Sequence, residues 1–342
     1  MTKLKNAGEK MEQKIYHNDD ADLNFLKGKT IAVIGYGSQG NAQANCLRDS
    51  GVHVIIGVRL NGESWNHAKK DGFEVYSISD AAAKADIVHL LVPDEVHKQI
   101  YEQNIVQHMK NGKMLSCSHG FNILFKRIVP PENVDVIMIA PKSPGTEERK
   151  AYLQGFGVPG LIAVEKDISG NAKDTALAIA KGLGLTRAGV LECTFGQEAI
   201  EDLFGEQTVL CGGIVELMKA GFDTLVDAGY PPEMAYFECI NEVKLIVDLI
   251  YEGGFTKMYD VVSNTAEYGG MTVGPYLINS GVRRRMKKVL KKIENGKFAK
   301  EITNEFEQDA PILAKGREEI KNSLVEKTGE KIRNLFEKKT KK

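Results

Sequence analysis

The stretch "IAVIGYGSQGNAQA", residues 31–44, decides the fold of the first half of the chain. A short apolar run leads into glycines at 35, 37 and 40, and a helix-forming sequence follows. In a strand–turn–helix unit, Gly35 permits the tight turn, Gly37 lets a pyrophosphate approach the backbone, and Gly40 lets the helix pack on the strand. N–H groups at the helix start then face the phosphates. The spacing predicts a dinucleotide site, against the alternative of a purely structural glycine turn.

Short apolar runs rich in β-branched residues continue after this loop to about residue 190. Segments with helical periodicity separate several of them, for example 39–50 and 172–184. Strands that alternate with helices indicate a parallel sheet covered on both faces. We therefore expect an α/β fold whose N-terminal domain is a Rossmann-type, doubly wound sheet. The predicted strands are 30–37, 52–58, 85–93, 112–117, 134–141 and 160–165.

After about residue 193 the apolar residues recur with a period near 3.6. Residues 196–229 end at Gly229 and two prolines, as a helix end does. A second long helix is predicted over 232–254, with further helices over about 275–294 and 311–337. The C-terminal domain is therefore expected to be nearly all helical. The predicted divisions are an N-terminal extension (1–20), a Rossmann domain that binds NADP (21–193) and a helical domain for metal and substrate (194–338).

Composition sets limits on partners and compartment. The chain has 342 residues and a net charge of −1, so charge gives no argument for nucleic acid or an anionic membrane as a partner. No apolar run approaches the roughly 20 residues of a membrane-spanning helix, and the charged N-terminus is not a secretory signal. The five cysteines are scattered and form no CxxC pair. We expect reduced thiols in a cytoplasmic protein, with neither nucleic acid nor membrane as partner.

The strand after the glycine loop indicates which dinucleotide binds. An NAD enzyme usually places an acid at the end of this strand, but here Arg59 and then Ser64 follow it. Arg59 can bind a 2′-phosphate through a charge-assisted fork, and Ser64 can donate a hydrogen bond to it. The prediction is NADPH, and the alternative is that Arg59 is a solvated surface charge. Within the loop, the predicted cofactor-binding residues are Gly35, Tyr36, Gly37, Ser38, Gln39 and Gly40.

Two pairs of acids stand four residues apart in the helical half. All seven histidines lie between residues 17 and 119, so a metal in this half must be held by oxygen, which favours Mg²⁺ or Mn²⁺. The segment around the second pair is apolar over most of its circumference, which predicts burial, and buried carboxylates need neutralising. Two cations could share the four acids. The alternative, that each acid pairs with a Lys or Arg or faces solvent, has even odds from spacing alone. The acids are Asp202, Glu206, Glu238 and Glu242.

Polar residues follow three of the predicted strands, at the sheet edge that carries the glycine loop. Ligands of open α/β sheets bind beyond this edge. A lone strand-end histidine is more often structural than catalytic, and a lysine between prolines can simply be exposed. Because this histidine and this lysine lie at the same sheet edge as the glycine loop, a functional role is favoured for both. The residues are Asp94, Glu95, Val96 and His97, expected to line the cofactor, then His119, and then Lys142 and Gly145.

Several motifs together resemble ketol-acid reductoisomerase, also called acetohydroxy-acid isomeroreductase, in its short-chain (class I) form. The likeness runs from about residue 20 to 336 and is carried by "GYGSQG" (35–40), "SHGFN" (118–122), "APKSPG" (140–145), "DLFGEQTVLCGG" (202–213), "AYFECINEVKLIVDLIYEGG" (235–254) and "SNTAEYGG" (263–270). The resemblance implies a Rossmann domain followed by a helical, knotted domain, NADPH and two Mg²⁺ ions as cofactors, and a homodimer or larger homo-oligomer.

The resemblance also implies roles for individual residues. Asp202 bridges the two ions, Glu206 completes one ion's site, and Glu238 and Glu242 serve the other. His119 is catalytic, Lys142 lies near the substrate oxygens, and Ser263 contacts substrate. Glu198 and Glu201 are left as ordinary charges on the helix surface.

Five positions in three segments depart from the family's usual sequence. The loop has Asn41 and Gln43 where the family commonly has histidines. Ser143 and Thr146 are closer to the long form. Gly62 stands where a Ser or Arg is common in the phosphate loop, which weakens the case for 2′-phosphate binding.

The implied reaction starts from a small 2-hydroxy-3-keto acid, 2-acetolactate or 2-aceto-2-hydroxybutyrate. A Mg²⁺-dependent alkyl migration is followed by NADPH reduction to a 2,3-dihydroxy-3-alkyl acid, in valine and isoleucine biosynthesis. One rival is a metal-independent, NADP-dependent hydroxy-acid dehydrogenase that uses Lys142 as acid and base. A second rival is a non-catalytic NADPH-binding sensor.

Overall fold

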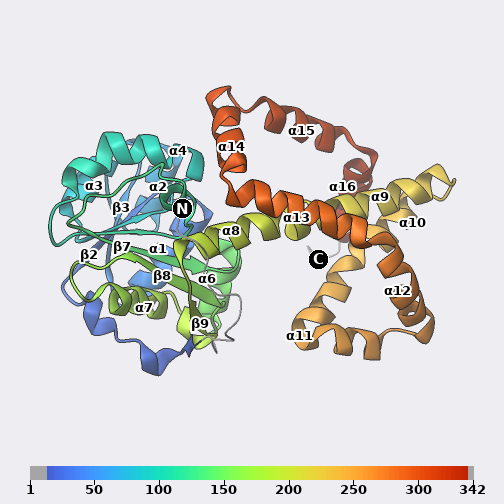
Figure 1. Ribbon diagram of the computed structural model, residues 1–342, viewed down its shortest axis with the longest axis horizontal. Helices are drawn as coiled ribbons and strands as arrows, with labels where there is room; N and C mark the ends of the chain where they lie inside the picture. The colour runs from blue at the N-terminus through green and yellow to red at the C-terminus, as the bar shows by residue number, and fades with distance from the viewer. Residues whose placement is uncertain (1–13, 338–342) are drawn as a thin grey trace. The chain divides into compact units, whose positions relative to one another are not determined.

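A computed structural model describes residues 14–337, and Figure 1 traces them in chain order. Most of the predicted extension over 1–20, and residue 338 of the predicted helical domain, lie outside the described residues. The chain divides into two compact units, with the division between Ala199 and Ile200. The predicted boundary was between residues 193 and 194.

A nine-stranded sheet forms the centre of the first unit, in the order β1-β9-β8-β7-β6-β5-β2-β3-β4. The strands from β7 to β4 run parallel, but β8 pairs with β7 and β1 pairs with β9 in antiparallel fashion. The strands are β1 (Ile15–Tyr16), β2 (Thr30–Ile34), β3 (His53–Gly57), β4 (Glu74–Tyr76), β5 (Ile87–Leu90), β6 (Met114–Cys117), β7 (Asp135–Pro141), β8 (Gly160–Lys166) and β9 (Val190–Glu192).

The Rossmann-type α/β fold is confirmed, but the expectation of a wholly parallel sheet is wrong at the β8 edge. Pro141, the last residue of β7, pairs with Gly160, the first residue of β8. The chain therefore leaves and re-enters the sheet at the same edge, because the intervening helix packs on α1 rather than crossing to the opposite edge. The short strands β1, β4 and β9 were not predicted.

Helices cover both faces of this sheet. Ile31 and Val33 of β2 pack with residues of α1 and α7, whereas Ala32 and Ile34 pack on the other face with α3. Figure 1 shows α3 and α7 on opposite sides of the strands. Full burial of an isoleucine contributes roughly 1.5–3 kcal/mol. The helices of this unit are α1 (Ser38–Asp49), α2 (Glu63–Lys70), α3 (Ile78–Lys84), α4 (Asp94–Ile100), α5 (Phe121–Leu124), α6 (Gly145–Leu153) and α7 (Ala172–Gly182), with short turns η1 (Asn18–Asp20), η2 (Leu23–Leu26), η3 (Tyr101–Ile105), η4 (Val106–His108) and η5 (Leu185–Arg187).

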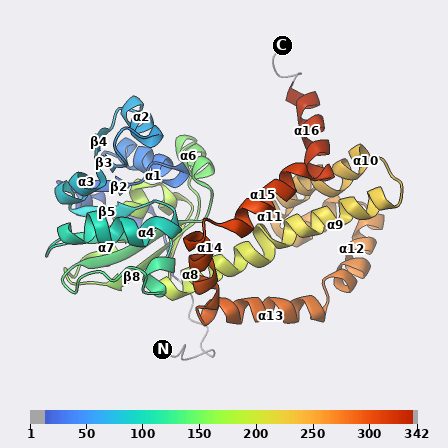
Figure 2. The same cartoon turned by 90° about the horizontal axis from the view of Figure 1, so that it is seen from above.

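The second unit is helical throughout its described residues, as predicted (Figure 2). The predicted helix over 275–294 begins instead at Ser280, because the Asn279 side chain accepts a hydrogen bond from the Gly281 N–H and caps it. The helices are α8 (Phe195–Gly205, which starts in the first unit), η6 (Glu206–Leu210), α9 (Gly213–Asp227), α10 (Pro232–Tyr236), η7 (Phe237–Asn241), α11 (Val243–Val261), α12 (Asn264–Leu277), α13 (Ser280–Glu294), α14 (Lys297–Glu307), α15 (Pro311–Asn322) and α16 (Leu324–Glu337).

The core of the second unit is small. Phe222, Ala235, Tyr236 and Ile332 form its buried apolar cluster, from α9, α10 and α16. Large apolar side chains elsewhere in the unit face solvent, for example Tyr251, Phe255 and Tyr276. Within residues 14–337, no helix has both the length and the apolar character needed to cross a membrane.

Candidate active site

The glycine loop joins β2 to α1 in a tight turn. Gly35 has a φ of 100°, and a Cβ there would lie 2.8 Å from the Leu91 carbonyl oxygen. A Cβ at Gly40 would lie 2.2 Å from the carbonyl oxygen of Gly35. A Cβ at Gly37, the residue before α1, would meet no atom within 4 Å. The loop therefore brings bare backbone and the first N–H groups of α1 to an open position, as an anion site requires.

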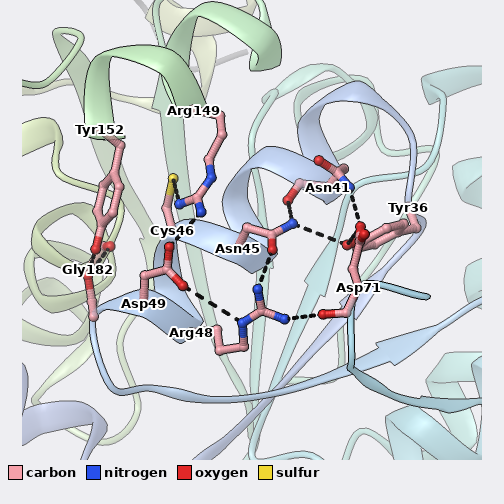
Figure 3. Close-up of polar contacts among 11 residues, drawn as sticks. Tyr36, Asn41, Asn45, Cys46, Arg48, Asp49, Asp71, Arg149, Tyr152 and Gly182 are labelled. Carbon is pink, nitrogen blue, oxygen red and sulfur yellow. Dashed lines mark hydrogen bonds and ion pairs between the residues drawn. The ribbon is translucent and has the colours of Figure 1, made fainter. Parts of the chain in front are cut away.

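The side chain of Tyr36 holds this loop to the turn after α2 (Figure 3). Its hydroxyl donates to Asp71 Oδ2 over 2.7 Å and accepts from Asn45 Nδ2, and Asn41 Nδ2 also donates to Asp71 Oδ2. Burial and the hydrogen bond to Asp71 raise the pKa of Tyr36. The ring of Tyr36 is thus engaged within the protein, which leaves its backbone for cofactor contact.

The two residues predicted to bind a 2′-phosphate flank the start of α2. Arg59 is exposed and forms no ion pair with any residue of the described range 14–337. Ser64 lies in the first turn of α2 and is partly exposed. Gly62 is the residue that precedes α2, so the position between them contributes no side chain. An accessible cation and hydroxyl are present here, and the exposed Glu63 lies between them in the sequence, at the first residue of α2.

A carboxylate orients the strand-end histidine. Asp94 Oδ2 accepts from His119 Nδ1 over 2.7 Å, and Asn122 Nδ2 donates to Asp94 Oδ1 over 2.8 Å. Burial alone would raise the pKa of Asp94, but the hydrogen bond and charge of His119 lower it. In neutral His119 this contact places the proton on Nδ1 and the lone pair on Nε2.

His97, one turn after Asp94, has a structural position. It is buried, its Nε2 donates to the Val92 carbonyl over 2.6 Å, and its Nδ1 accepts from Asn122. Burial lowers its pKa, so it is neutral and holds Asn122 in place. Glu95 and Val96 lie in the first turn of α4 and are partly exposed.

Lys142 is joined to a buried acid that the sequence analysis misassigned. Its Nζ donates to Glu198 Oε1 over 2.9 Å, and Glu198 Oε2 accepts from the Gly120 N–H over 2.8 Å. Glu198 is 2% exposed, so its prediction as a surface charge is wrong, whereas Glu201 is exposed as expected. Because Gly120 follows His119, one carboxylate ties both candidate catalytic strand ends together. A buried charge is tolerated here because each oxygen has a donor.

Gly145 allows α6 to approach the glycine loop. A Cβ at this position would lie 2.4 Å from the Ser38 carbonyl oxygen. Any other residue would push α6 away from the start of α1. Gly145 therefore fixes the distance between the loop after Lys142 and the predicted cofactor site.

Three acids follow one another along a single helical face. Glu198, Asp202 and Glu206 are spaced by four residues, and α8 gives way to a π-turn, η6, at Glu206. Cys211 N–H donates to the Glu206 carbonyl five residues back, over 2.8 Å. Asp202 is partly exposed and Glu206 is exposed. π-turns inside helices are frequent at functional sites, and this one begins at a predicted metal ligand.

The second pair of acids also lies at a π-turn, but the prediction that it is buried is wrong within this chain. Glu238 and Glu242 are exposed and form no ion pair among the described residues. The Glu242 N–H donates to the Phe237 carbonyl over 3.1 Å, five residues back. Apolar residues of the same segment, such as Leu245 and Val247, are exposed as well, so the apolar surface that predicted burial is not covered within the chain.

A pair of candidate ligand groups does meet in the first unit. A ring nitrogen of His119 and a carboxylate oxygen of Glu198 lie within 4.8 Å of each other. Among residues 14–337, none of Glu206, Glu238 and Glu242 lies in a cluster of three or more His, Cys, Asp or Glu side chains close enough to share a metal ion. Ser263 caps α12, with its Oγ accepting from the Ala266 N–H over 3.2 Å.

Two residues of this network were missed from the sequence. Asn122 stands inside "SHGFN", where its link to Asp94 depends on the fold. Glu198 could have been found from its spacing of four residues before Asp202. The apolar context that favoured the other acids is absent around Glu198 in the sequence, because its burial comes from the strand ends and not from its own helix.

Both units match known domain families. Residues 25–189 match the NADPH-binding domain of acetohydroxy acid isomeroreductase, and residues 195–338 match the C-terminal domain of ketol-acid reductoisomerase.

Individual relatives are similar over nearly the whole chain. A ketol-acid reductoisomerase (NADP(+)) of Akkermansia muciniphila is 60% identical, over 94% of this chain and 99% of its own length. A ketol-acid reductoisomerase (NAD(+)) of the uncultured archaeon GZfos26G2 is 59% identical, over 94% and 98%. A solved structure of an NADH-preferring ketol-acid reductoisomerase from an uncultured archaeon is 58% identical, covers 94% of this chain and 99% of its own, and superposes with a TM-score of 0.92.

Proposed function

Because the chain belongs to the ketol-acid reductoisomerase family, we propose how its residues divide the family's reaction between them. The enzyme rearranges and reduces 2-acetolactate or 2-aceto-2-hydroxybutyrate to a 2,3-dihydroxy-3-alkyl acid, in valine and isoleucine biosynthesis. It is an oxidoreductase that uses a nicotinamide cofactor and carries out an alkyl migration in the same site. The observation that carries the proposal is Glu198, which joins Lys142 to the backbone beside His119.

The reducing cofactor is NADPH. Arg59 and Ser64 flank the start of α2 without a neighbouring acid on the strand end, which suits a 2′-phosphate. Relatives are named for both NAD(+) and NADP(+), so the family alone does not decide. The test compares kcat/KM for NADPH and NADH, in the protein and in Arg59→Ala. We expect NADPH to be preferred, and the preference to fall in the variant. A higher kcat/KM for NADH in the unaltered protein would overturn the assignment.

Two divalent cations, Mg²⁺ by preference, are held by carboxylates of the helical unit. Asp202 and Glu206 share one helical face, and Glu238 and Glu242 share another, each pair at a π-turn. Carboxylate oxygens are the donors that hard cations take, and the exposed pairs have room for water as further ligands. Bound there, the ions would act as Lewis acids on the hydroxyl and carbonyl oxygens of the substrate.

The chain's own groups orient substrate and handle protons. Lys142 Nζ, held by Glu198, donates a hydrogen bond to a substrate oxygen. His119 Nε2 accepts a proton, and Asp94 stabilises the imidazolium that forms. Glu198 keeps these two groups at a fixed separation. Ser263, at the start of α12, contacts the substrate.

The helical unit acts as part of a homodimer or larger assembly, in which a second copy covers it. Beside the two exposed acids of η7 and α11, Phe237, Leu245 and Val247 are also exposed. Exposed apolar side chains continue along α9, α11 and α12, more than soluble single chains leave uncovered. Closing this surface against a second copy would bury Glu238 and Glu242, which bound cations would then neutralise. The five cysteines are free thiols, in keeping with a cytoplasmic enzyme.

The decisive measurement is oxidation of NADPH with 2-acetolactate, with Mg²⁺ and with EDTA. We expect turnover only with Mg²⁺, and its loss in Asp202→Asn. Turnover that survives EDTA would instead show the metal-independent dehydrogenase. Cofactor binding without turnover of acetolactate would show the sensor.

A further inference from the structure

A chain of buried hydrogen bonds runs beneath the glycine loop and takes no part in the mechanism above. His89 of β5 bonds to Ser116 of β6 through Nδ1 (2.8 Å) and to Gln43 of α1 through Nε2 (2.7 Å). Gln43 Nε2 donates to Gln39 Oε1 over 2.9 Å, and Gln39 Nε2 donates to the Ser143 carbonyl over 2.9 Å. Gln43, His89 and Ser116 are each 0% exposed. Gln39 and Ser143 are partly exposed. We call these five residues, after their buried centre, the buried chain.

The end of the buried chain at Ser143 sets the direction of every hydrogen bond in it. A carbonyl can only accept, so the amide nitrogen of Gln39 must face Ser143. Its oxygen then faces Gln43, which must donate with its nitrogen and accept with its oxygen. Gln43 Oε1 therefore accepts a hydrogen bond from the N–H at His89 Nε2, and His89 Nδ1 accepts one from the Ser116 hydroxyl.

His89 is neutral in this arrangement. Burial lowers its pKa to about 4, so at neutral pH the ring has one N–H and one lone pair. The buried chain uses both, and no charge is placed inside the sheet. A neutral, fully satisfied chain of this kind holds its members in one arrangement.

The buried chain reaches the positions next to both candidate catalytic groups. Ser143 follows Lys142, and Gln43 Nε2 also donates to Ser118 Oγ, beside His119, over 3.1 Å. Gln39 and Gln43 lie on the same face of α1, whose first turn is the predicted cofactor site. Glu198 already ties Lys142 to the His119 loop without using α1. Gln43 in addition fixes the distance between those two groups and α1, the helix whose first turn is the predicted cofactor site.

We propose that Gln43 is a positioning residue that sets the alignment of the nicotinamide cofactor with the substrate held near His119 and Lys142. The proposal rests on the proposed function, since it assumes a bound cofactor and substrate. It predicts a specific defect. Hydride transfer needs the cofactor and substrate in register, whereas the tie from Glu198 to Lys142 and Gly120 does not use the Gln43 side chain.

The test replaces Gln43 by the similarly long, apolar Met and compares it with a matched control. Ser50→Ala removes the hydrogen bonds from Ser50 to the Gly182 carbonyl and to Tyr152, at the other end of α1, where Figure 3 shows the partners. Turnover of 2-acetolactate, the deuterium isotope effect with NADPH labelled at the transferred hydrogen, the Kd for NADPH and Tm are measured for each. The unaltered enzyme, measured alongside, tests the proposed function itself.

In Gln43→Met we expect kcat to fall about 10- to 100-fold and the isotope effect on kcat to rise, with Kd for NADPH changed less than about threefold. Ser50→Ala should lower Tm but keep the kcat and isotope effect of the unaltered enzyme. A Gln43→Met enzyme with normal kcat and isotope effect, or with weakened NADPH binding at normal kcat, would overturn the proposal.

A double variant separates positioning from stability. In Gln43→Met the His89 imidazole loses its hydrogen-bond partner, which should lower Tm. The double variant with His89→Leu removes this imidazole, so part of the Tm loss should be recovered. The link from Gln43 to Gln39 and Ser143 is still missing, so kcat and the isotope effect should stay as in Gln43→Met. Recovery of kcat together with Tm would show that the defect was only one of stability, and would overturn the positioning role.

Discussion

Glu148 and Glu198 in the first unit are 1% and 2% exposed, whereas Glu206, Glu238 and Glu242 in the second unit face solvent. In the first unit, Glu198 and Gln43 obtain hydrogen-bond partners from neighbouring segments, whereas the carboxylate oxygens of buried Glu148 have none among the described residues. The second unit leaves acids and large apolar side chains exposed side by side on the same helices. The first unit holds its candidate catalytic groups in place within one chain, whereas under the proposed function the acids of the second unit depend on metal ions and a second copy.

The largest effect expected from this difference is complementation between two inactive variants. Asp202→Asn and Glu242→Gln should each lose most activity, since each removes the charge of a proposed metal ligand. If one site takes Asp202 from one chain and Glu242 from another, a mixed dimer has one intact site, and random re-assortment gives about one quarter of normal activity. The measurement is turnover after the variants are unfolded and refolded together.

The control for this experiment refolds each variant with itself. No recovery in the mixture, although mixed dimers form, would mean that both acids belong to the same chain's site. The second unit would then differ from the first only in the exposure of its acids and apolar side chains, and its site would not need a second copy of the chain.

The buried acid of the first unit should have the next largest effect. Glu198→Gln keeps the shape but removes the charge that holds Lys142, and we expect kcat to fall by about 10²-fold. Glu201→Gln, on the same helix but exposed, is the matched control and should behave as the unaltered enzyme. The measurement is steady-state kcat and KM for both variants. Equal effects of the two substitutions would contradict a role for Glu198 in the site.

Buried Glu148 should make the stability of the protein depend on pH. No described group hydrogen-bonds to its carboxylate oxygens, and burial raises its pKa to about 8 from 4.5. The folded state therefore holds this proton more tightly than the unfolded state, so stability is full below about pH 4.5 and is lost as pH rises through about 8. The loss relative to Glu148→Gln should be on the order of 3–5 kcal/mol.

Urea unfolding of both proteins between pH 5 and pH 9 measures this difference. Glu147→Gln, at the exposed neighbouring position of α6, should follow the unaltered protein at every pH. A constant difference in the free energy of unfolding between Glu148→Gln and the unaltered protein would show that Glu148 finds a partner in solution.

The smallest effect is expected from removing one helix cap in each unit. Ser77 caps α3 and Ser263 caps α12, each with its Oγ accepting a backbone N–H. Alanine at either position should cost about 1 kcal/mol in the free energy of unfolding. Only Ser263→Ala should also lower kcat/KM for acetolactate, by about tenfold. Equal kinetics in both variants would leave Ser263 as a cap alone.

The sequence predicted the parts of the site that depend on local geometry. The glycine loop follows from the spacing of Gly35, Gly37 and Gly40, and the helical half follows from its apolar period. Prediction failed where two distant segments meet. In the sequence, Glu198 differs from Glu201 only by its spacing of four residues before Asp202. The strand ends around Gly120 and Lys142 bury Glu198 and not Glu201. The burial of Glu238 and Glu242 was mispredicted because the apolar surface around them, including Leu245 and Val247, is itself exposed within the chain.

Short motifs with fixed spacing were enough to predict the fold class and the family, and they pointed to candidate site residues. The tertiary structure decided which of those residues are held by neighbours and which are left open. Hydrogen-bond partners come from strands and helices brought together by the sheet, so the ties from Glu198 to Lys142 and from Gln43 to His89 span dozens of residues. No local pattern records such a contact, since it exists only once the apolar core has closed around it.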